Sequence, residues 1–165
     1  MSIQYDFKGK VVLITGSSSG IGAGTALLFA KSGADLVITG RNAENLSKVA
    51  EDCRKLTSRV LPVVGDVTKE EDIKRLVEET INEFGKLDIL VNNVGTFGMV
   101  AIDDPDYMEA THKIFDTNLN SVLLLTHLCV GYLAKTKGNV VIISSVAGKI
   151  AVSLRGKGSQ KLFFI

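Results

Sequence analysis

The sequence predicts an α/β fold built on a parallel, doubly wound sheet of five strands with flanking helices. Short apolar runs rich in β-branched residues alternate along the chain with segments whose apolar side chains recur at helical spacing. The first run is apolar without interruption, as in strands buried on both faces, and a glycine-rich turn follows it at once. Strands joined through helices form right-handed crossovers and therefore run parallel.

The first strand is predicted over residues 11–15, where VVLIT lies, and the second over 36–40, where LVITG lies. Between them, residues 21–31 form a helix that Gly33 ends as a C-cap. Asn42 is the expected N-cap of the next helix, because one helical stripe of apolar residues follows it. That stripe comprises Leu46, Val49, Ala50 and Cys53.

The third strand is predicted over residues 60–65, where VLPVVG lies. The helix after it begins in the stretch TKEED, where Thr68 and Glu71 have the spacing of a capping box. Gly85 is expected to end this helix.

The fourth and fifth strands are predicted over residues 87–91 and 139–143, with a long helical region over 107–135 between them. The segment LNSVLLLTHLCVGYL in that region is apolar nearly all round, which requires burial on more than one side. A membrane span is the alternative, but its apolar run is shorter than the ~20 residues that a bilayer requires. It is also interrupted by polar residues, among them His127, which we interpret as a core or interface histidine.

Composition excludes several classes of partner. The 165 residues suit one domain, and a net charge of +1 without any cluster of basic residues argues against nucleic acid and membrane surfaces. The two cysteines, Cys53 and Cys129, lie far apart without CxxC spacing, so no metal site is predicted. The first ten residues carry charges where an export signal is apolar, and we therefore expect a cytoplasmic protein.

The loop TGSSSGIGAG, which has glycines at 16, 20 and 22, is the first candidate site. Its spacing is neither that of the common dinucleotide fingerprint nor that of a P-loop. Its place between a buried strand and a helix N-terminus nevertheless predicts a pyrophosphate site, to which Ser17, Ser18 and Ser19 would add hydroxyl donors. The alternative is a tight glycine turn that binds no ligand.

The end of the second strand indicates which dinucleotide the predicted pyrophosphate site would bind. An acidic residue at this place binds a free ribose 2′-hydroxyl, whereas arginine binds a 2′-phosphate. The chain has Gly40 and Arg41 there, and Glu44 comes later in the helix. Because a guanidinium makes charge-assisted bonds to phosphate, NADP is favoured over NAD. The alternative is that Arg41 is a solvated surface residue.

Three motifs together carry a family resemblance: TGxxxGIG after the first strand, NNVG at 92–95 and ISS at 143–145. Their combination resembles the short-chain dehydrogenase/reductase family from Lys8 to Val152. The resemblance implies a Rossmann-type NAD(P)-binding domain over residues 1–152, incomplete at its C-terminus, and an irregular basic tail over 153–165. From Ser153 the sequence departs from the family as an altered or truncated reading frame would.

The resemblance also implies roles for single residues. Asp66 and Val67 would contact the adenine, with the carboxylate accepting from the exocyclic amine. Asn92, Asn93 and Gly95 would flank the adenosine ribose, with Val94 in place of the alanine that the family has. The residues predicted to bind the cofactor are Gly16, Ser18, Gly20, Ile21, Gly22, Arg41, Asp66, Val67, Asn93 and Gly95.

The implied reaction is hydride transfer between NADP(H) and a small alcohol or ketone. The family uses a tyrosine as acid, a lysine beside it, a serine and an asparagine. Asn118 and Ser145 match the last two, but Gly158 and Leu162 stand where the tyrosine and the lysine are expected. We therefore expect this chain to be inactive alone. A non-catalytic dinucleotide-binding or interaction module is the alternative function.

The resemblance further implies an exposed apolar surface. In the family, the tyrosine helix packs beside the helix that contains the asparagine. Without that helix, apolar side chains between Leu119 and Leu133 would be exposed, which favours homo-oligomer formation through this segment.

Overall fold

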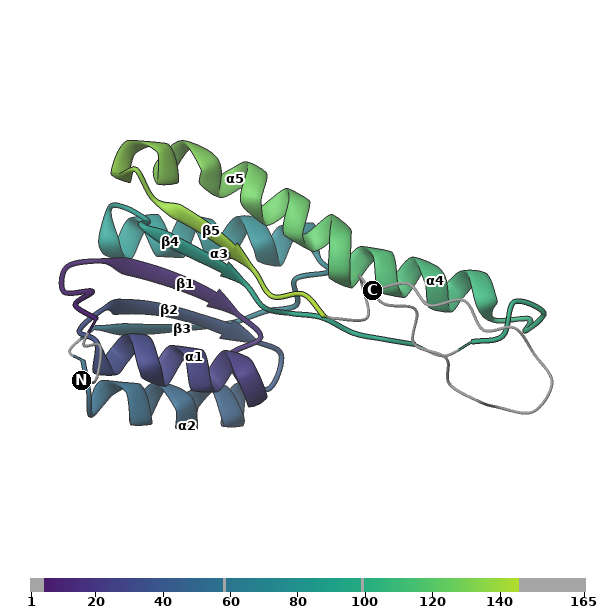
Figure 1. Ribbon diagram of the computed structural model, residues 1–165, viewed down its shortest axis with the longest axis horizontal. Coiled ribbons are helices and arrows are strands. Elements are labelled where there is room, and N and C mark those ends of the chain that lie inside the picture. Colours follow the sequence, from purple (N-terminus) through teal and green to yellow (C-terminus); the bar gives the residue numbers. More distant parts are fainter. Residues whose placement is uncertain (1–4, 58, 99, 146–165) are drawn as a thin grey trace.

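The computed structural model, which describes residues 5–57, 59–98 and 100–145, confirms the predicted fold class (Figure 1). Within these residues, five parallel strands form one sheet in the order β3-β2-β1-β4-β5. The chain runs outward from β1 to β3 and returns to place β4 on the other side of β1, which makes the β1/β4 boundary a topological switch point. The strands are β1 (Val11–Thr15), β2 (Asp35–Gly40), β3 (Val60–Val64), β4 (Ile89–Asn92) and β5 (Asn139–Ile142).

The helices cover both faces of the sheet. Figure 1 shows α1 and α2 on one face and α3 and α5 on the other, while α4 extends beyond the sheet. The long helical region predicted before the fifth strand is present, with a π-helical segment, η1, between α4 and α5. The helices are α1 (Gly20–Lys31), α2 (Ala43–Arg54), α3 (Glu70–Phe84), α4 (Tyr107–Phe115), η1 (Asp116–Asn120) and α5 (Ser121–Thr136).

Alternation along β1 divides the core into two halves. Val12 and Ile14 pack with the buried residues of α1 and α2, whereas Val11 and Leu13 pack with those of α3 and α5. Because side chains of a strand point alternately to the two faces, a strand covered by helices on both sides must be apolar throughout. This explains the uninterrupted run VVLIT.

Three of the predicted helix ends are confirmed and one is wrong. Gly33 follows the end of α1 in the left-handed region, with φ of 85°. Asn42 caps α2, because its Oδ1 accepts a hydrogen bond of 2.8 Å from the backbone N–H of Asn45. Gly85 ends α3 in the left-handed region with φ of 73°. The capping box is wrong: α3 begins after Lys69, and the hydroxyl of Thr68 donates to the carboxylate of Asp66 instead. The helix begins one residue later than the capping box requires, and the carboxylate of Asp66 holds this hydroxyl in the turn before it.

Asp88 joins the segments that precede β1 and β4 at the amino-terminal edge of the sheet. Its side chain is only 4% exposed, and it forms ion pairs with Lys10 at 2.9 Å and Lys86 at 3.1 Å. It also accepts a hydrogen bond of 3.0 Å from the backbone N–H of Val11, the first residue of β1. Burial alone would raise the pKa of this carboxyl, but the bonds from Val11, Lys10 and Lys86 outweigh burial and hold the pKa below its ordinary value.

Helix α5 is buried on one side only. Leu125, Cys129 and Leu133 face the core, whereas Leu123 is 58% and Val130 54% exposed. The expectation of burial on more than one side is therefore wrong for the described residues, and the expectation of exposed apolar side chains in this segment is confirmed. His127 is exposed as well, so it is no core residue. None of the described helices combines the length and the apolar character that a bilayer crossing requires.

Candidate nucleotide-binding site

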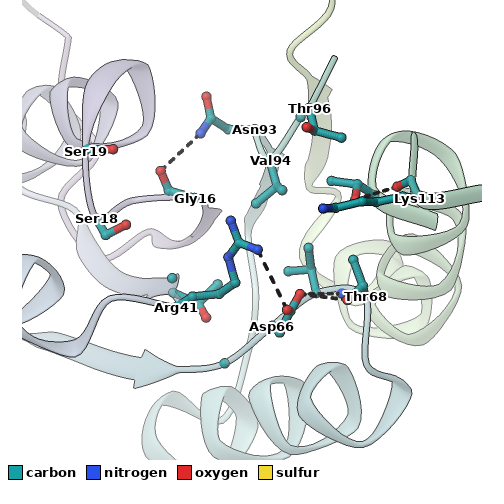
Figure 2. Close-up of a pocket in the computed structure, with 16 residues that line it drawn as sticks. Gly16, Ser18, Ser19, Arg41, Asp66, Thr68, Asn93, Val94, Thr96 and Lys113 are labelled. Atoms are coloured by element: carbon teal, nitrogen blue, oxygen red, sulfur yellow. Dashed lines mark hydrogen bonds and ion pairs between the residues drawn. The ribbon is translucent and has the colours of Figure 1, made fainter. Parts of the chain in front are cut away.

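A cleft of about 370 Å³ lies at the carboxyl ends of the strands, across the switch point between β1 and β4. This is where ligands bind in open parallel sheets. Its walls come from the glycine loop after β1, the tip of β2, the turns after β3 and β4, and one face of α4 and η1 (Figure 2). Of the predicted cofactor residues, Gly16, Ser18, Arg41, Asp66, Val67, Asn93 and Gly95 line this cleft.

The glycine loop requires glycine for two separate reasons. Gly16 and Gly20 have φ of +67° and +56°, in the left-handed region that side chains disfavour. Gly22 is required by a close approach, because a Cβ there would lie 2.2 Å from the carbonyl oxygen of Gly16. Gly20, Ile21 and Gly22 form the first turn of α1 and stand next to the cleft lining instead of in it.

The three serines of the loop divide between the cleft and the core. Ser18 and Ser19 line the cleft, as predicted. Ser17 does not: it is fully buried, its hydroxyl donates to the carbonyl of Ile14 at 2.8 Å, and its N–H donates to the carbonyl of Thr39. The prediction that Ser17 offers a donor to a phosphate is therefore wrong, because its hydroxyl bonds back to β1 and its backbone N–H joins the turn to β2.

The turn after β4 is fastened directly to the glycine loop. The side-chain amide of Asn93 donates to the carbonyl of Thr15 at 2.9 Å, and the backbone N–H groups of Asn93 and Val94 donate to the hydroxyl of Thr15. Val94 lies against the loop as well, since its Cγ2 would be 3.0 Å from a Cβ at Gly16. The two loops that bracket the switch point are therefore joined by direct hydrogen bonds.

The tip of β2 presents Arg41 to the cleft. Gly40 allows the glycine loop to pass close by, because a Cβ at Gly40 would lie 2.9 Å from the hydroxyl of Ser18. The Arg41 side chain is 78% exposed, and its nearest ion pair is to Asp66, at 4.0 Å. A pair of this length and exposure contributes little to stability and leaves the guanidinium available to a ligand.

Asp66 is oriented so that one carboxylate oxygen is used and the other is open to the cleft. Its Oδ1 accepts from the backbone N–H and the hydroxyl of Thr68, at 3.0 and 2.9 Å. Its Oδ2 faces Arg41 (Figure 2). Asp72 holds the turn that carries Asp66, because its carboxylate accepts a hydrogen bond of 2.9 Å from the backbone N–H of Asp66. This bond is the main cause that lowers the pKa of Asp72, and the hydrogen bond from Arg75 is the second.

Asn118 is committed to the fold through its side chain. Its Oδ1 accepts from the backbone N–H of Thr96 at 2.8 Å, and its Nδ2 donates to the carbonyl of Thr96 at 2.7 Å. The π-helical segment presents this side chain to the loop after β4, outside the cleft lining. Ser145 is exposed and follows the end of β5. Positions 158 and 162 and the predicted tail over 153–165 lie outside the described residues.

Several cleft residues were missed by the sequence analysis. The residues at strand ends could have been predicted, because ligands bind at the carboxyl ends of the strands in a parallel sheet. Nothing local could have found those on α4 and η1, because their place depends on how this helix lies against the sheet. The missed residues are Thr39, Gly65, Thr68, Thr96, Lys113 and Thr117. In the part of the chain that the structure describes, no group of three or more potential ligands is arranged for a metal ion.

Comparison with known proteins agrees with this geometry. The family model described as short chain dehydrogenase matches residues 10–156, which extends past Val152. The 11-beta-hydroxysteroid dehydrogenase-like 3 of Arabidopsis thaliana is 42% identical over 146 residues, which cover 88% of this chain and 47% of that protein. The 11-beta-hydroxysteroid dehydrogenase A of Sesamum indicum is 40% identical, over 85% of this chain and 40% of its own length. The chain thus spans about half the length of the curated relatives that it matches.

Solved structures show the same likeness. A 7 alpha-hydroxysteroid dehydrogenase complexed with NADH and 7-oxo glycochenodeoxycholic acid superposes with a TM-score of 0.85 at 30% identity, covering 90% of this chain and 58% of that one. The apo-form glucose dehydrogenase of Caenorhabditis elegans gives a TM-score of 0.74 at 41% identity, with coverage of 86% and 56%. These neighbours share the parallel sheet and its flanking helices.

Proposed function

This chain belongs to the short-chain dehydrogenase family of oxidoreductases, and from that premise we propose that it binds NADP(H) in the cleft at the carboxyl edge of its sheet. The family binds NAD or NADP. The choice of NADP rests on one observation: Arg41 stands at the tip of β2 beside Ser18, with no carboxylate at this place to bind a ribose 2′-hydroxyl.

The residues present fit a dinucleotide. The close approaches at Gly22 and Gly40 bring backbone and hydroxyl donors of the glycine loop to the mouth of the cleft, at the N-terminus of α1. The open Oδ2 of Asp66 accepts an amine. When bound, the nicotinamide supplies or accepts a hydride, and the chain's own residues hold the nucleotide that carries it.

The charges of the cleft favour an anionic ligand. Its lining contains two cationic side chains, Arg41 and Lys113, and one carboxylate, Asp66. A phosphate on the adenosine ribose would replace the long contact between Arg41 and Asp66 by short, charge-assisted bonds to the guanidinium. A 2′-hydroxyl offers no charge to this arginine.

The reaction that we assign to the whole protein is hydride transfer between NADP(H) and a small alcohol or ketone. Ser145 would orient the substrate oxygen, as the family resemblance implies. The side chain of Asn118 is held by Thr96, so any water that Asn118 supports would bind its backbone. Because Gly158 and Leu162 replace the acid and its lysine, we expect the 165-residue chain to consume NADPH with ketones only at background rate.

Substitution of Arg41 tests the cofactor assignment. Arg41→Asp should weaken NADPH binding by about tenfold or more, because it removes charge-assisted bonds and adds a repelling carboxylate, while NADH binding is retained. Calorimetric titration measures both. Lys48→Asp is the matched control, since it makes the same change of charge on α2 at an exposed residue outside the cleft. Equal affinities for the two cofactors, unaltered by Arg41→Asp, would refute the role of Arg41.

The exposed side of α5 supports a second part of the proposal. Leu119, Leu123 and Val130 are 44%, 58% and 54% exposed on this continuous helical region. We propose that a second copy of the chain covers them, because an apolar surface of this kind is costly in water. The cytoplasmic location stays a prediction from the sequence.

A further inference from the structure

The two outermost strands of the sheet, β3 and β5, each have one free side that faces no other described strand (Figure 1). The free side of β3 is blocked at every residue that faces outward. Backbone groups of alternate residues point to opposite sides of a strand, and those of Val60, Pro62 and Val64 point away from β2. Arg54 donates to the carbonyl of Val60 at 3.0 Å, Arg75 donates to that of Val64 at 2.7 Å, and Pro62 has no N–H. A further strand therefore finds no free ladder on β3.

The free side of β5 has no such protection in the part of the chain that the structure describes. The N–H groups of Asn139 and Ile143 donate to the backbone carbonyls of residues 88 and 92 at 2.9 Å each, so these two residues and Val141 face β4. Val140 and Ile142 therefore direct their N–H and C=O groups outward. Residues 139–143 include neither a charged side chain nor a proline, and the four apolar residues among them are β-branched and exposed. Such a strand is suited to pairing with another strand.

The spacing of the outward groups makes β5 complementary to a second copy of itself. In an antiparallel pair, two residues that lie opposite each other with their backbone groups facing exchange both hydrogen bonds. A two-fold axis at Val141 places Val140 of each copy opposite Ile142 of the other, so that all outward groups of these residues are paired. The side chains that meet are β-branched and uncharged, which stabilises cross-strand pairs and opposes no like charges.

The same axis is compatible with the proposed contact of α5. A two-fold axis that relates antiparallel neighbours in one sheet is perpendicular to the sheet, so each face of one copy continues into the same face of the other. Helix α5 packs on β4 and β5 (Figure 1), and the two α5 helices would therefore lie on one face of the joined sheet. Because the axis pairs one patch with itself, the assembly closes as a dimer.

We propose that β5 binds β5 of a second copy of this chain in antiparallel orientation, with Val141 at the two-fold axis, and joins the two five-stranded sheets into one. The inference is independent of the proposed nucleotide site, and it adds a backbone-paired surface to the contact proposed for α5. Val141 belongs to the face opposite α5, because its register partner, Val91, packs with the buried residues of α1 and α2. Substitutions of Val141 therefore test the strand pairing without altering the exposed side of α5.

Opposite charges at Val141 test the pairing. Val141→Lys and Val141→Glu should each weaken dimer formation by about tenfold or more, because each charge meets its own copy at the axis. An equimolar mixture of the two variants should recover a dimer, since lysine then lies opposite glutamate. Sedimentation equilibrium measures the dimer, and native mass spectrometry identifies the mixed one. Val64→Lys is the matched control, because it makes the same change at an exposed residue of the blocked strand β3 and should leave the dimer unchanged.

Hydrogen exchange on the unsubstituted chain gives a second measurement that needs no variant. The amide hydrogens of Val140 and Ile142 should exchange slowly at concentrations where the dimer forms and rapidly on dilution. Slow exchange in a monomer would assign the free side of β5 to other residues of the same chain and overturn the proposal. Rapid exchange at all concentrations would overturn it as well.

The remaining outcomes separate this inference from the contact of α5. A dimer that persists in both Val141 variants and is lost in Leu123→Lys would leave only the contact of α5 and overturn the strand pairing. Dimer loss that mixing does not reverse would overturn the axis at Val141, and assemblies larger than a dimer would overturn the closed symmetry. Because Val141 is exposed, we expect its variants to fold, which circular dichroism checks.

Discussion

The two edges of the sheet use their charged residues in opposite ways. At the amino-terminal edge, Asp88 is buried and its carboxylate is shared by two lysines and a backbone N–H, all within 3.1 Å. At the carboxyl edge, Arg41 and Asp66 are 4.0 Å apart in an open cleft. Charges that satisfy one another hold a fold together, whereas charges left partly unsatisfied are available to a ligand. The difference separates the edge that holds the fold together from the edge at which we propose that a nucleotide binds.

The largest effect is expected from a substitution at the carboxyl edge of the sheet. Gly22→Ala should abolish nucleotide binding, because its Cβ would lie 2.2 Å from a backbone oxygen of Gly16, and neither group can rotate away. Unfolding free energy should fall by roughly 1–3 kcal/mol from the overpacking. Titration with NADPH and urea unfolding measure the two effects.

Gly24→Ala is the matched control for Gly22→Ala. Gly24 lies in the same helix, and a Cβ there would meet no atom within 4 Å. Alanine should stabilise α1 by up to about 1 kcal/mol and leave binding intact. Nucleotide binding that survives Gly22→Ala would place the ligand away from the glycine loop.

The next largest effect is expected from a substitution at the amino-terminal edge. Asp88→Asn should lower the free energy of unfolding at pH 7 by about 2 kcal/mol, because two lysines lose their partner while remaining half exposed. Nucleotide affinity should not change, since Asp88 lies at the other end of the strands. A loss of affinity equal to that of a cleft variant would remove the distinction between the two edges.

The pH dependence of this difference follows from the lowered pKa of Asp88. A carboxyl whose folded-state pKa lies below its unfolded value of about 3.9 stabilises the fold above that pH. Its contribution is lost as pH falls through the folded-state pKa. The stability difference between the unsubstituted chain and Asp88→Asn should therefore be constant from pH 7 to about 5 and shrink below about 4, as measured by urea unfolding.

The smallest effect on stability is expected from a substitution of Arg41. Arg41→Ala should change the free energy of unfolding by less than about 0.5 kcal/mol, because its ion pair with Asp66 is long and exposed. The same substitution should weaken NADPH binding. Destabilisation as large as that of Asp88→Asn would mean that the charges of the cleft hold the fold together.

The sequence predicts the sheet well because strands buried on both faces have a distinct composition. The first strand is predicted to the residue, and the fourth begins at Ile89, later than the predicted range, because Leu87 and Asp88 precede the first ladder pair. Local chemistry also found the cap at Asn42. The capping box predicted at Thr68 is wrong, because the hydroxyl of Thr68 bonds to the carboxylate of Asp66 in the turn before the helix.

The candidate site was predictable where its residues lie at strand ends and in the glycine loop. Ser17 shows the limit, because a sequence of three serines does not say which one turns inward. Lys113 shows another limit. It reaches the cleft only because the π-helical segment and the bonds between Asn118 and Thr96 set the course of α4, and such contacts join residues far apart in the chain.

The paired bonds between Asn118 and Thr96 also link two local opening events. To expose its amide hydrogen, Thr96 must release Asn118, and the helix around Asn118 then loses its attachment to the loop after β4. Amide hydrogens of the loop and of η1 should therefore exchange with deuterated water at a common rate, as one cooperative unit. A nucleotide that contacts only the loop would slow exchange in the helix as well.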